Sequence, residues 1–243
     1  SGFGGGYSTF ARNLGKTLTT LGFPVYIIAL GEAETHTKTD FGTLVTVNSS
    51  LLSFNVTALP GLPWFSYKFS LAIRSIMREY PSVKPIIWGI GPWGLAASFL
   101  KIFFRTPIVH INSYFTTTKH EWGRSLQALS VSDYGLLIPT KFFLIYHTIV
   151  RFLTVLERIV LSTSDVIVTN YLSTERILTE QFSISKNKFI RTPFPIEAYI
   201  RSSKNKKIAD PIQLPKQYIL YLSRHDPRKG VNVLLHAAKI LKN

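Results

Sequence analysis

The chain has 243 residues, with 28 Lys and Arg against 13 Asp and Glu, so its formal net charge is +15. This excess favours anionic partners such as nucleotides or a phospholipid surface. No DNA- or RNA-binding signature accompanies it, so we expect no nucleic-acid partner. The absence of cysteine excludes disulfide bonds and thiolate metal sites. With 46% apolar residues, the composition predicts a folded core rather than disorder.

A glycine-rich stretch opens the chain. Gly4, Gly5 and Gly6 allow backbone N–H groups to approach an anion closely, although a flexible terminus can have the same composition. Apolar residues at helical spacing follow as far as Leu21, and Gly22 is placed to end that helix. The pattern then predicts a strand at residues 25–30.

Strands and helices are predicted to alternate along the rest of the chain. Short apolar runs and helical spacing predict strands at residues 43–47, 86–90, 107–111, 165–169 and 188–192, and helices at residues 64–80, 94–104 and 172–182. This alternation is typical of an α/β fold, so we expect a Rossmann-like parallel sheet.

His110 closes the apolar run of the strand predicted at residues 107–111. We therefore expect it near the rim of a cleft, where it is either a site residue or a hydrogen-bonded core histidine. Asn112, Ser113 and Tyr114 follow it and are candidates to line the acceptor side of that cleft.

Residues 136–160 are strongly apolar, but Pro139 and Lys141 interrupt the run. A transmembrane helix needs about 20 mostly apolar residues, and the uninterrupted part is shorter. The pattern favours a partly buried helix. The alternative is a helix on a membrane surface, because aromatic and basic residues are mixed in it.

A strand, a loop and a helix are predicted near the end of the chain. Residues 218–222 form a short aromatic and apolar run, and helical spacing begins at Val231. Arg224 and Lys229 lie in the loop between them, at a strand end and a helix start, where an α/β sheet binds phosphates. A solvated basic loop is the other interpretation of the same residues.

The loop from Ser223 to Gly230, with the apolar positions that follow it, resembles the opening of the nucleotide-sugar domain of family 4 glycosyltransferases. These are retaining enzymes of the GT-B architecture, which has two Rossmann-like domains. The resemblance extends to residues 1–28, 107–111, 164–170 and 186–197. The last of these segments departs from the family pattern, because Phe194 and Pro195 stand where the family has Asn-Gly.

The resemblance implies a role for each candidate residue. Arg224 and Lys229 would hold the donor diphosphate and act in catalysis, His110 would contact the transferred sugar as a third catalytic residue, and Gly4 to Gly6 would face the donor phosphates. The donor would be a nucleoside-diphosphate sugar, and the acceptor a glycan or a lipid-linked saccharide, as in polysaccharide biosynthesis. We expect no metal, because no Asp-x-Asp pair occurs, and no cofactor.

The resemblance also implies a domain organisation. Residues 1–197 would form the acceptor-side domain, residues 198–216 a linker, and residues 217–243 the start of a truncated nucleotide-sugar-binding domain. The family's acidic Glu-x7-Glu pair would lie downstream, so we expect this chain alone to be inactive. We expect a cytoplasmic protein attached peripherally to the inner face of the membrane.

Two other classes of function fit the same residues. One is a non-catalytic basic module that binds an anionic membrane or a protein partner. The other is a different GT-B enzyme, either an inverting transferase or a sugar-nucleotide epimerase. Nucleotide-sugar binding separates the first from an enzyme, and the anomeric form of the product decides the second.

Overall fold

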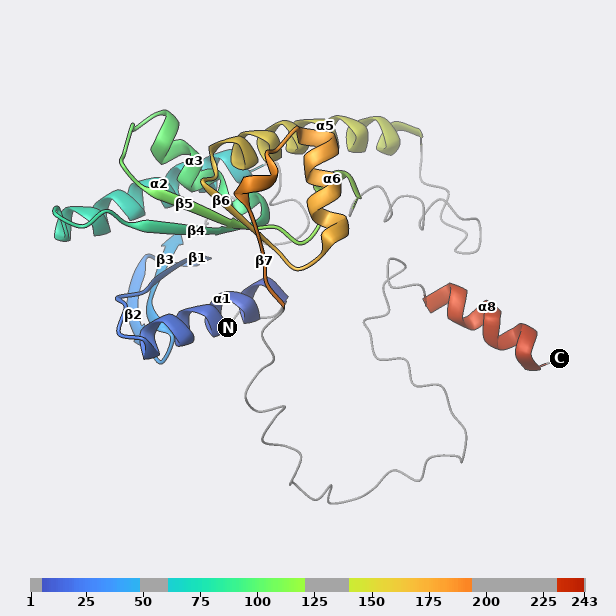
Figure 1. Cartoon of the computed structure of the whole chain (residues 1–243), viewed down its shortest axis with the longest axis horizontal. Coiled ribbons are helices and arrows are strands. Elements are labelled where there is room, and N and C mark those ends of the chain that lie inside the picture. The colour runs from blue at the N-terminus through green and yellow to red at the C-terminus, as the bar shows by residue number, and fades with distance from the viewer. Residues whose placement is uncertain (1–5, 49–60, 121–139, 194–230, 243) are drawn as a thin grey trace, which may run out of the picture. The chain divides into compact units, whose positions relative to one another are not determined.

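The computed structural model describes residues 6–48, 61–120, 140–193 and 231–242 (Figure 1). The chain divides into two compact units, one of residues 1–117 and 149–195, the other of residues 118–148 and 196–243. Helix α5 (Thr140–Thr163) contributes to both units, and helix α8 (Val231–Lys242) belongs to the second. The linker predicted at residues 198–216 lies outside the described residues.

The first helix and strand of the larger unit follow the sequence prediction. Helix α1 (Gly6–Thr20) is followed by strand β1 (Tyr26–Gly31). Gly22 adopts the left-handed conformation with φ +85°, and the Phe23 N–H donates a 3.1 Å hydrogen bond to the Leu18 carbonyl. This is the Schellman arrangement that glycine favours because it has no Cβ, so the predicted helix end is confirmed.

The expectation of a parallel sheet throughout is wrong at one strand. β1 pairs in parallel with β3 (Gly42–Asn48), but β2 (Thr35–Thr39) pairs with β3 in antiparallel fashion. The turn at Asp40 and Phe41 is too short for the crossover that a parallel pair requires. Gly42 has φ +116°, and a Cβ there would approach the Val25 carbonyl oxygen to 2.6 Å. The turn therefore depends on glycine.

The four-stranded sheet is parallel, as predicted. Its order is β4-β5-β6-β7, with β4 at Ile86–Ile90, β5 at Val109–Ser113, β6 at Val166–Thr169 and β7 at Phe189–Arg191. Together with its helices it forms a Rossmann-like α/β fold. β5 spans Val109–Ser113 rather than the predicted residues 107–111, and its extension to Ser113 decides the position of His110.

Helices α2 (Leu62–Glu79), α3 (Leu95–Ile102) and α5 pack against one another. Helix α6 (Leu172–Phe182) begins and ends where the sequence predicts, and short 3₁₀ turns precede α3 (η2, Gly91–Gly94) and β7 (η4, Lys186–Lys188). The contact among α2, α3 and α5 is an apolar cluster of Leu62, Leu95, Leu153, Leu156 and Val160. Of the helices that the structure describes, none combines the length and the apolar character needed to cross a bilayer.

A second apolar cluster joins the two sheets. Val47 of β3 packs with Phe69 of α2 and Leu100 of α3, and Ile28 of β1 and Ile87 of β4 pack against the same cluster. The hydroxyls of Tyr26 and Tyr80 are also 2.9 Å apart across this region. Within the described residues β1 and β4 each pair on one side only, so packing holds the sheets together.

Candidate functional site

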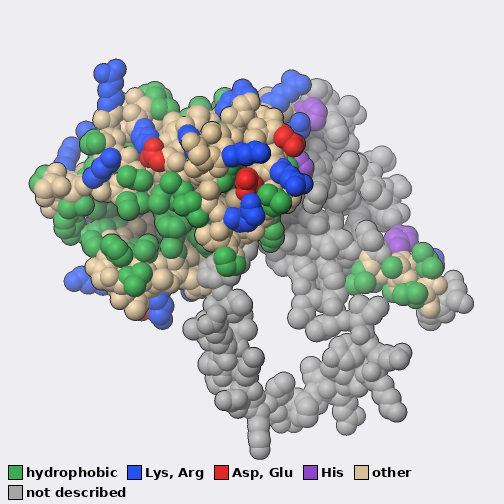
Figure 2. Space-filling view, in the orientation of Figure 1, with side chains coloured by type: hydrophobic (Ala, Val, Ile, Leu, Met, Phe, Trp, Pro, Cys, Tyr) green, Lys and Arg blue, Asp and Glu red, His purple; other side chains and the backbone are tan. Residues whose placement is uncertain are grey.

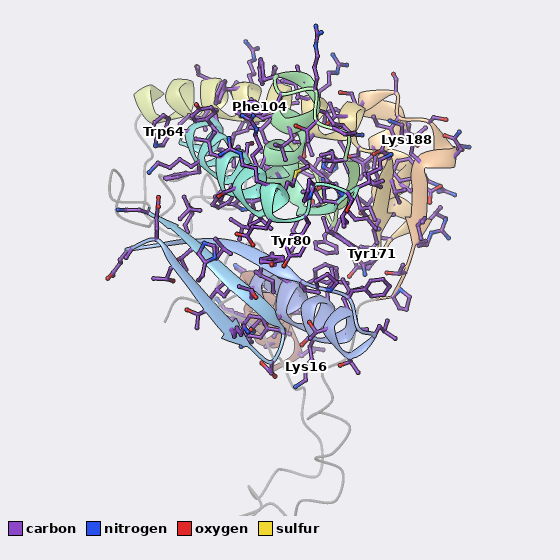
Figure 3. All side chains as sticks on the ribbon, turned by 90° about the vertical axis from the view of Figure 1, so that its left-hand side faces the viewer. Lys16, Trp64, Tyr80, Phe104, Tyr171 and Lys188 are labelled. Carbon is purple, nitrogen blue, oxygen red and sulfur yellow. The ribbon has the colours of Figure 1, made fainter. Side chains whose placement is uncertain are left out.

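The four parallel strands end at the same edge of their sheet, which we call the carboxyl edge. It consists of the residues that follow β4, β5, β6 and β7, namely Gly91–Gly94, Tyr114–Phe115, Asn170–Tyr171 and Thr192. Open α/β sheets bind ligands at this edge. Figure 3 labels Tyr171 at this edge and Lys188 near the opposite end of the sheet.

Glycines shape the exit from β4. Gly91 has φ +57°, and a Cβ on Gly94 would come within 2.6 Å of Asn112 Oδ1 and 2.8 Å of Val160 Cγ1. The missing side chain allows the turn into α3 to pack directly on Asn112, whose Nδ2 donates a 3.2 Å hydrogen bond to the Gly91 carbonyl. Asn112 is fully buried, so the prediction that it lines an open acceptor site is wrong.

The end of β5 is held rigidly rather than left open. Ser113 is fully buried and accepts a 2.8 Å hydrogen bond from the Trp88 indole N–H. Tyr114 is also buried, and its hydroxyl donates to the buried Glu157 carboxylate on α5. Because each side chain is enclosed, the backbone beyond Tyr114 is fixed in position for its neighbours at the carboxyl edge.

The accessible polar groups of this edge follow β6. Tyr171 is half exposed, and its backbone N–H lies 3.4 Å from Thr169 Oγ1. Asn170 is partly exposed, but its Nδ2 donates to the Thr192 carbonyl at 3.0 Å and its Oδ1 is a buried atom that has no hydrogen-bond partner among the described residues. The sequence pattern predicted no role for these residues. Their position directly after a predicted strand was the signal that could have marked them as site residues.

Helix α1 lies beside the carboxyl edge. The Phe10 ring of α1 meets the Phe115 ring at a centroid distance of 5.4 Å and an interplanar angle of 75°. Phe115 follows β5, and its carbonyl accepts a 3.0 Å hydrogen bond from the Thr174 hydroxyl. The N-terminal half of α1 is therefore near the strand ends. The first turn of α1 contains no acidic residue. A helix start leaves N–H groups without partners inside the helix and carries a partial positive charge, which is suited to an anion.

His110 does not lie at this edge. It is the second residue of β5 and is fully buried. Its backbone N–H donates a 2.8 Å hydrogen bond to Asp165 Oδ2, and its carbonyl accepts one of 2.8 Å from the Asp165 N–H. Asp165 immediately precedes β6, so His110 is near the opposite, amino edge. The prediction that His110 is at a cleft rim is wrong, because pairing with β6 extends β5 as far as Ser113.

The neighbours of His110 form a cluster that joins β5, α3, α5 and the start of β6. We call it the amino-edge cluster; its members are Ser98, Lys101, His110, Thr163 and Asp165. Lys101 Nζ donates to Asp165 Oδ2 at 2.6 Å and to the Thr163 carbonyl at 2.9 Å. Thr163 Oγ1 lies 2.8 Å from Ser98 Oγ and 3.4 Å from His110 Nδ1.

The electrostatics of this cluster favour a neutral histidine. Burial, with a smaller contribution from the Lys101 charge, lowers the pKa of His110 to about 4, although Asp165 opposes the shift. Burial alone would raise the pKa of Asp165, but hydrogen bonds from Lys101 and from the His110 N–H lower it below its ordinary value. A neutral, enclosed imidazole beside an ion pair is suited to a structural role.

The remaining candidates lie outside the described residues. Gly4, Gly5, Arg224 and Lys229 are among them, and Gly6 begins α1. Their roles in donor binding therefore stay predictions. Within the part of the chain that the structure describes, no group of His, Cys, Asp or Glu side chains is arranged to hold a metal ion.

Comparison with known proteins adds no further assignment. No protein-family model matches the chain, and no curated protein matches it. The residues of the two edges and the motifs in the sequence therefore carry any assignment of function.

Proposed function

We propose that the protein is a cytoplasmic retaining glycosyltransferase. It would transfer a sugar from a nucleoside-diphosphate sugar to a hydroxyl of a glycan or lipid-linked acceptor, and it would work at the inner face of the membrane as a peripheral protein. The resemblance of residues 223–238 to the donor-binding loop of family 4 enzymes supports the reaction class. The Rossmann-like fold agrees with it but is shared by many other functions.

One observation carries the proposal furthest. The Phe10–Phe115 contact brings the glycine-preceded helix α1 to the carboxyl edge of the parallel sheet. A helix start attracts phosphate, and the carboxyl edge is the ligand-binding edge of such sheets. Two independent preferences for an anionic ligand thus coincide at one place in the fold.

The chemistry requires stabilisation of a leaving diphosphate. As the bond between the anomeric carbon and the phosphate oxygen breaks, negative charge grows on the diphosphate, and we assign its stabilisation to Arg224 and Lys229. The acceptor hydroxyl oxygen bonds to the anomeric carbon on the same face, and its proton passes to the departing phosphate oxygen. Positioned cations act most strongly where charge develops, so no metal is needed in this scheme.

The acceptor side of the proposed site differs from the sequence prediction. His110 has no part in it, because its side chain is enclosed near the amino edge. We assign acceptor contacts instead to Asn170 and Tyr171, which are partly exposed at the carboxyl edge. An aromatic ring and an amide are suited to a sugar, which presents apolar faces and hydroxyl groups.

Turnover of nucleoside-diphosphate sugars by the intact protein tests the reaction class. Arg224→Ala or Lys229→Ala should lower kcat by about 10²–10³-fold, equivalent to about 3–4 kcal/mol. The effect on the donor KM should be smaller, because the stabilised charge is largest in the transition state.

Arg228→Ala is the matched control, since it removes a cation from the same loop and should cost little. Equal losses for Arg228→Ala and Lys229→Ala would show that only the general charge of the loop matters. Near-normal turnover of folded Arg224→Ala and Lys229→Ala variants would contradict the proposal.

A further inference from the structure

An exposed aromatic patch covers the outer side of α2 and the end of α3. Trp64, Tyr67 and Leu71 of α2 are 47%, 41% and 42% exposed, and Phe103, directly after α3, is 68% exposed. Phe104 completes the group, which we call the aromatic patch. The rings of Trp64, Tyr67 and Phe104 are contiguous, because Trp64 and Tyr67 are 6.1 Å apart between centroids and Tyr67 and Phe104 are 6.4 Å apart, whereas the Phe103 ring contacts Phe99 at 5.2 Å.

The aromatic patch is not the inner face of α2. That helix already packs Leu62, Phe65, Phe69 and Ile73 into the protein, and these side chains are buried. A surface helix normally presents charged or polar residues on the side away from the core. Helix α2 is apolar on both sides for its first three turns, so its outer stripe is suited to a second apolar environment.

Cations border the aromatic patch. Lys68 Nζ lies 5.7 Å from the centroid of the Trp64 ring, and the Arg74 guanidinium lies 4.5 Å from that of Phe104. Arg105, just beyond Phe104, is also exposed. The acidic residue of α2, Glu79, lies about 22 Å along the helix axis from Trp64 at 1.5 Å per residue. The immediate border is therefore cationic.

Helix α5 adds a smaller stripe of the same character. Phe152 and Val155 are 44% and 58% exposed, and Arg151 and Arg158 beside them are exposed as well. In Figure 3, Trp64 and Phe104 lie on the side of the molecule away from α1. Figure 2 shows Lys and Arg side chains among hydrophobic ones, with few acidic side chains, on the described surface in view.

We propose that the aromatic patch docks on an anionic phospholipid bilayer, with its rings at the boundary between headgroups and acyl chains. Trp and Tyr favour that boundary because they are amphipathic. Arg74 and Arg105 would reach the lipid phosphates, whereas the Lys68 ammonium already donates a 2.9 Å hydrogen bond to the Asn48 carbonyl. The formal net charge of +15 adds a long-range attraction. This identifies the surface for the peripheral attachment in the proposed function and rests on that attachment, but not on the sugar-transfer reaction.

The position differs from the one that the sequence suggested. The sequence favoured a partly buried helix within residues 136–160, most of which lies in α5, and offered a membrane-surface helix as the alternative. In the structure, the part of α5 after Ile149 buries Leu153, Leu156 and Val160 against α2 and α3, which leaves a narrow exposed stripe. The aromatic patch is broader and contains three rings that are contiguous in space, so it is the stronger anchor.

Vesicle flotation of the intact protein tests the surface. Vesicles of phosphatidylcholine with phosphatidylglycerol in equal parts are compared with pure phosphatidylcholine vesicles at low and high salt. The wild type should bind the anionic vesicles, less so as salt rises. Trp64→Ser with Phe103→Ser should weaken binding to the anionic vesicles by about tenfold or more. The double variant removes two aromatic side chains that the bilayer would partly bury.

The matched control is Leu21→Ser with Phe23→Ser, which removes two apolar residues near the end of α1 that are 66% and 59% exposed, at least as exposed as Trp64. This variant should float like the wild type, and circular dichroism should show that both double variants are folded. A third variant, Phe152→Ser with Val155→Ser, should lose less binding than the Trp64 and Phe103 variant.

Each contrary result has a distinct meaning. If the α5 variant loses binding while the Trp64 and Phe103 variant retains it, the assigned surface is wrong. If the wild type binds no anionic vesicle at low salt, peripheral attachment is wrong as well. Turnover with a soluble acceptor, measured in parallel, tests the transferase reaction separately, since it does not require the bilayer.

Discussion

The two edges of the four-stranded sheet use polar side chains in opposite ways. At the amino edge, Lys101, Asp165 and the His110 backbone satisfy one another within a compact network. At the carboxyl edge, Tyr171 is half exposed and Asn170 partly exposed, whereas His110 near the amino edge is fully buried. The difference shows that a polar residue on a strand is a candidate for ligand binding only when its position along that strand is known.

Acidic pH should produce the largest effect, and it should act through the amino edge. The pKa of His110 is lowered from 6.5 to about 4 in the folded protein, so the unfolded chain takes up this proton first. The contribution of neutral His110 to the free energy of unfolding is complete above pH 6.5. It falls by about 3 kcal/mol as the pH drops toward about 4. Urea unfolding at neutral pH and near pH 4 measures the loss.

His110→Gln is the comparison for this experiment, because a glutamine carries no proton at either pH. It should lose less stability on acidification than the wild type does. Equal losses in the two proteins would mean that other groups dominate the acid response. Turnover of the folded His110→Gln variant should stay near that of the wild type. If His110 were catalytic, this replacement would abolish turnover.

Gly94→Ala tests the close packing of the carboxyl edge. The new Cβ would lie 2.6 Å from Asn112 Oδ1 and 2.8 Å from Val160 Cγ1, so α3 or α5 must shift. Such overpacking costs about 2 kcal/mol, measurable as a lower urea midpoint. Gly94→Ala should cost less in an Asn112→Ser background than in the wild type, because one of the two clashes is absent there; Asn112→Ser alone is the reference, since it loses the hydrogen bond to the Gly91 carbonyl. An equal cost in the two backgrounds would indicate that Val160 is the controlling contact.

Asp165→Ala should have a somewhat smaller effect at the amino edge. It removes the acceptor of the His110 N–H and the partner of Lys101, but the Asp165 side chain is 47% exposed and water replaces part of the interaction. We expect a loss of about 1–2 kcal/mol in the free energy of unfolding.

The control is Asp40→Ala, because the Lys16–Asp40 pair is 63% and 67% exposed and should contribute no measurable stability. Equal shifts in melting temperature for the two variants would contradict a special role for the amino-edge cluster.

Apart from the Asp40→Ala control, the smallest effect is expected for Glu175→Ala at the carboxyl edge. Arg191 Nη2 lies 2.8 Å from Glu175 Oε2, with the arginine side chain 50% and the glutamate side chain 17% exposed. Because water reaches the arginine, such a pair contributes about 0.5 kcal/mol. A double-mutant cycle with Arg191→Ala measures the coupling, and a value above about 1 kcal/mol would show that the carboxyl edge also depends on ion pairs.

The sequence by itself determined the features that depend on near neighbours. Periodicity and turn residues predicted β4, the length of α6 and the glycine that ends α1, because each rests on spacing within a few residues. The parallel four-stranded sheet followed from the alternation of strands with helices. The short polar strand β2 escaped prediction, since its exposed residues show no apolar pattern.

Only the tertiary structure decided which polar residues became enclosed and which helix faces stayed open. The position of His110 depends on Asp165, which is 55 residues away along the chain. The exposure of Trp64 and Tyr67 depends on which side of α2 packs against α3 and α5, and α2 is apolar on both sides. Strand ends and buried faces are set by residues far apart along the chain, so they cannot be predicted from local spacing.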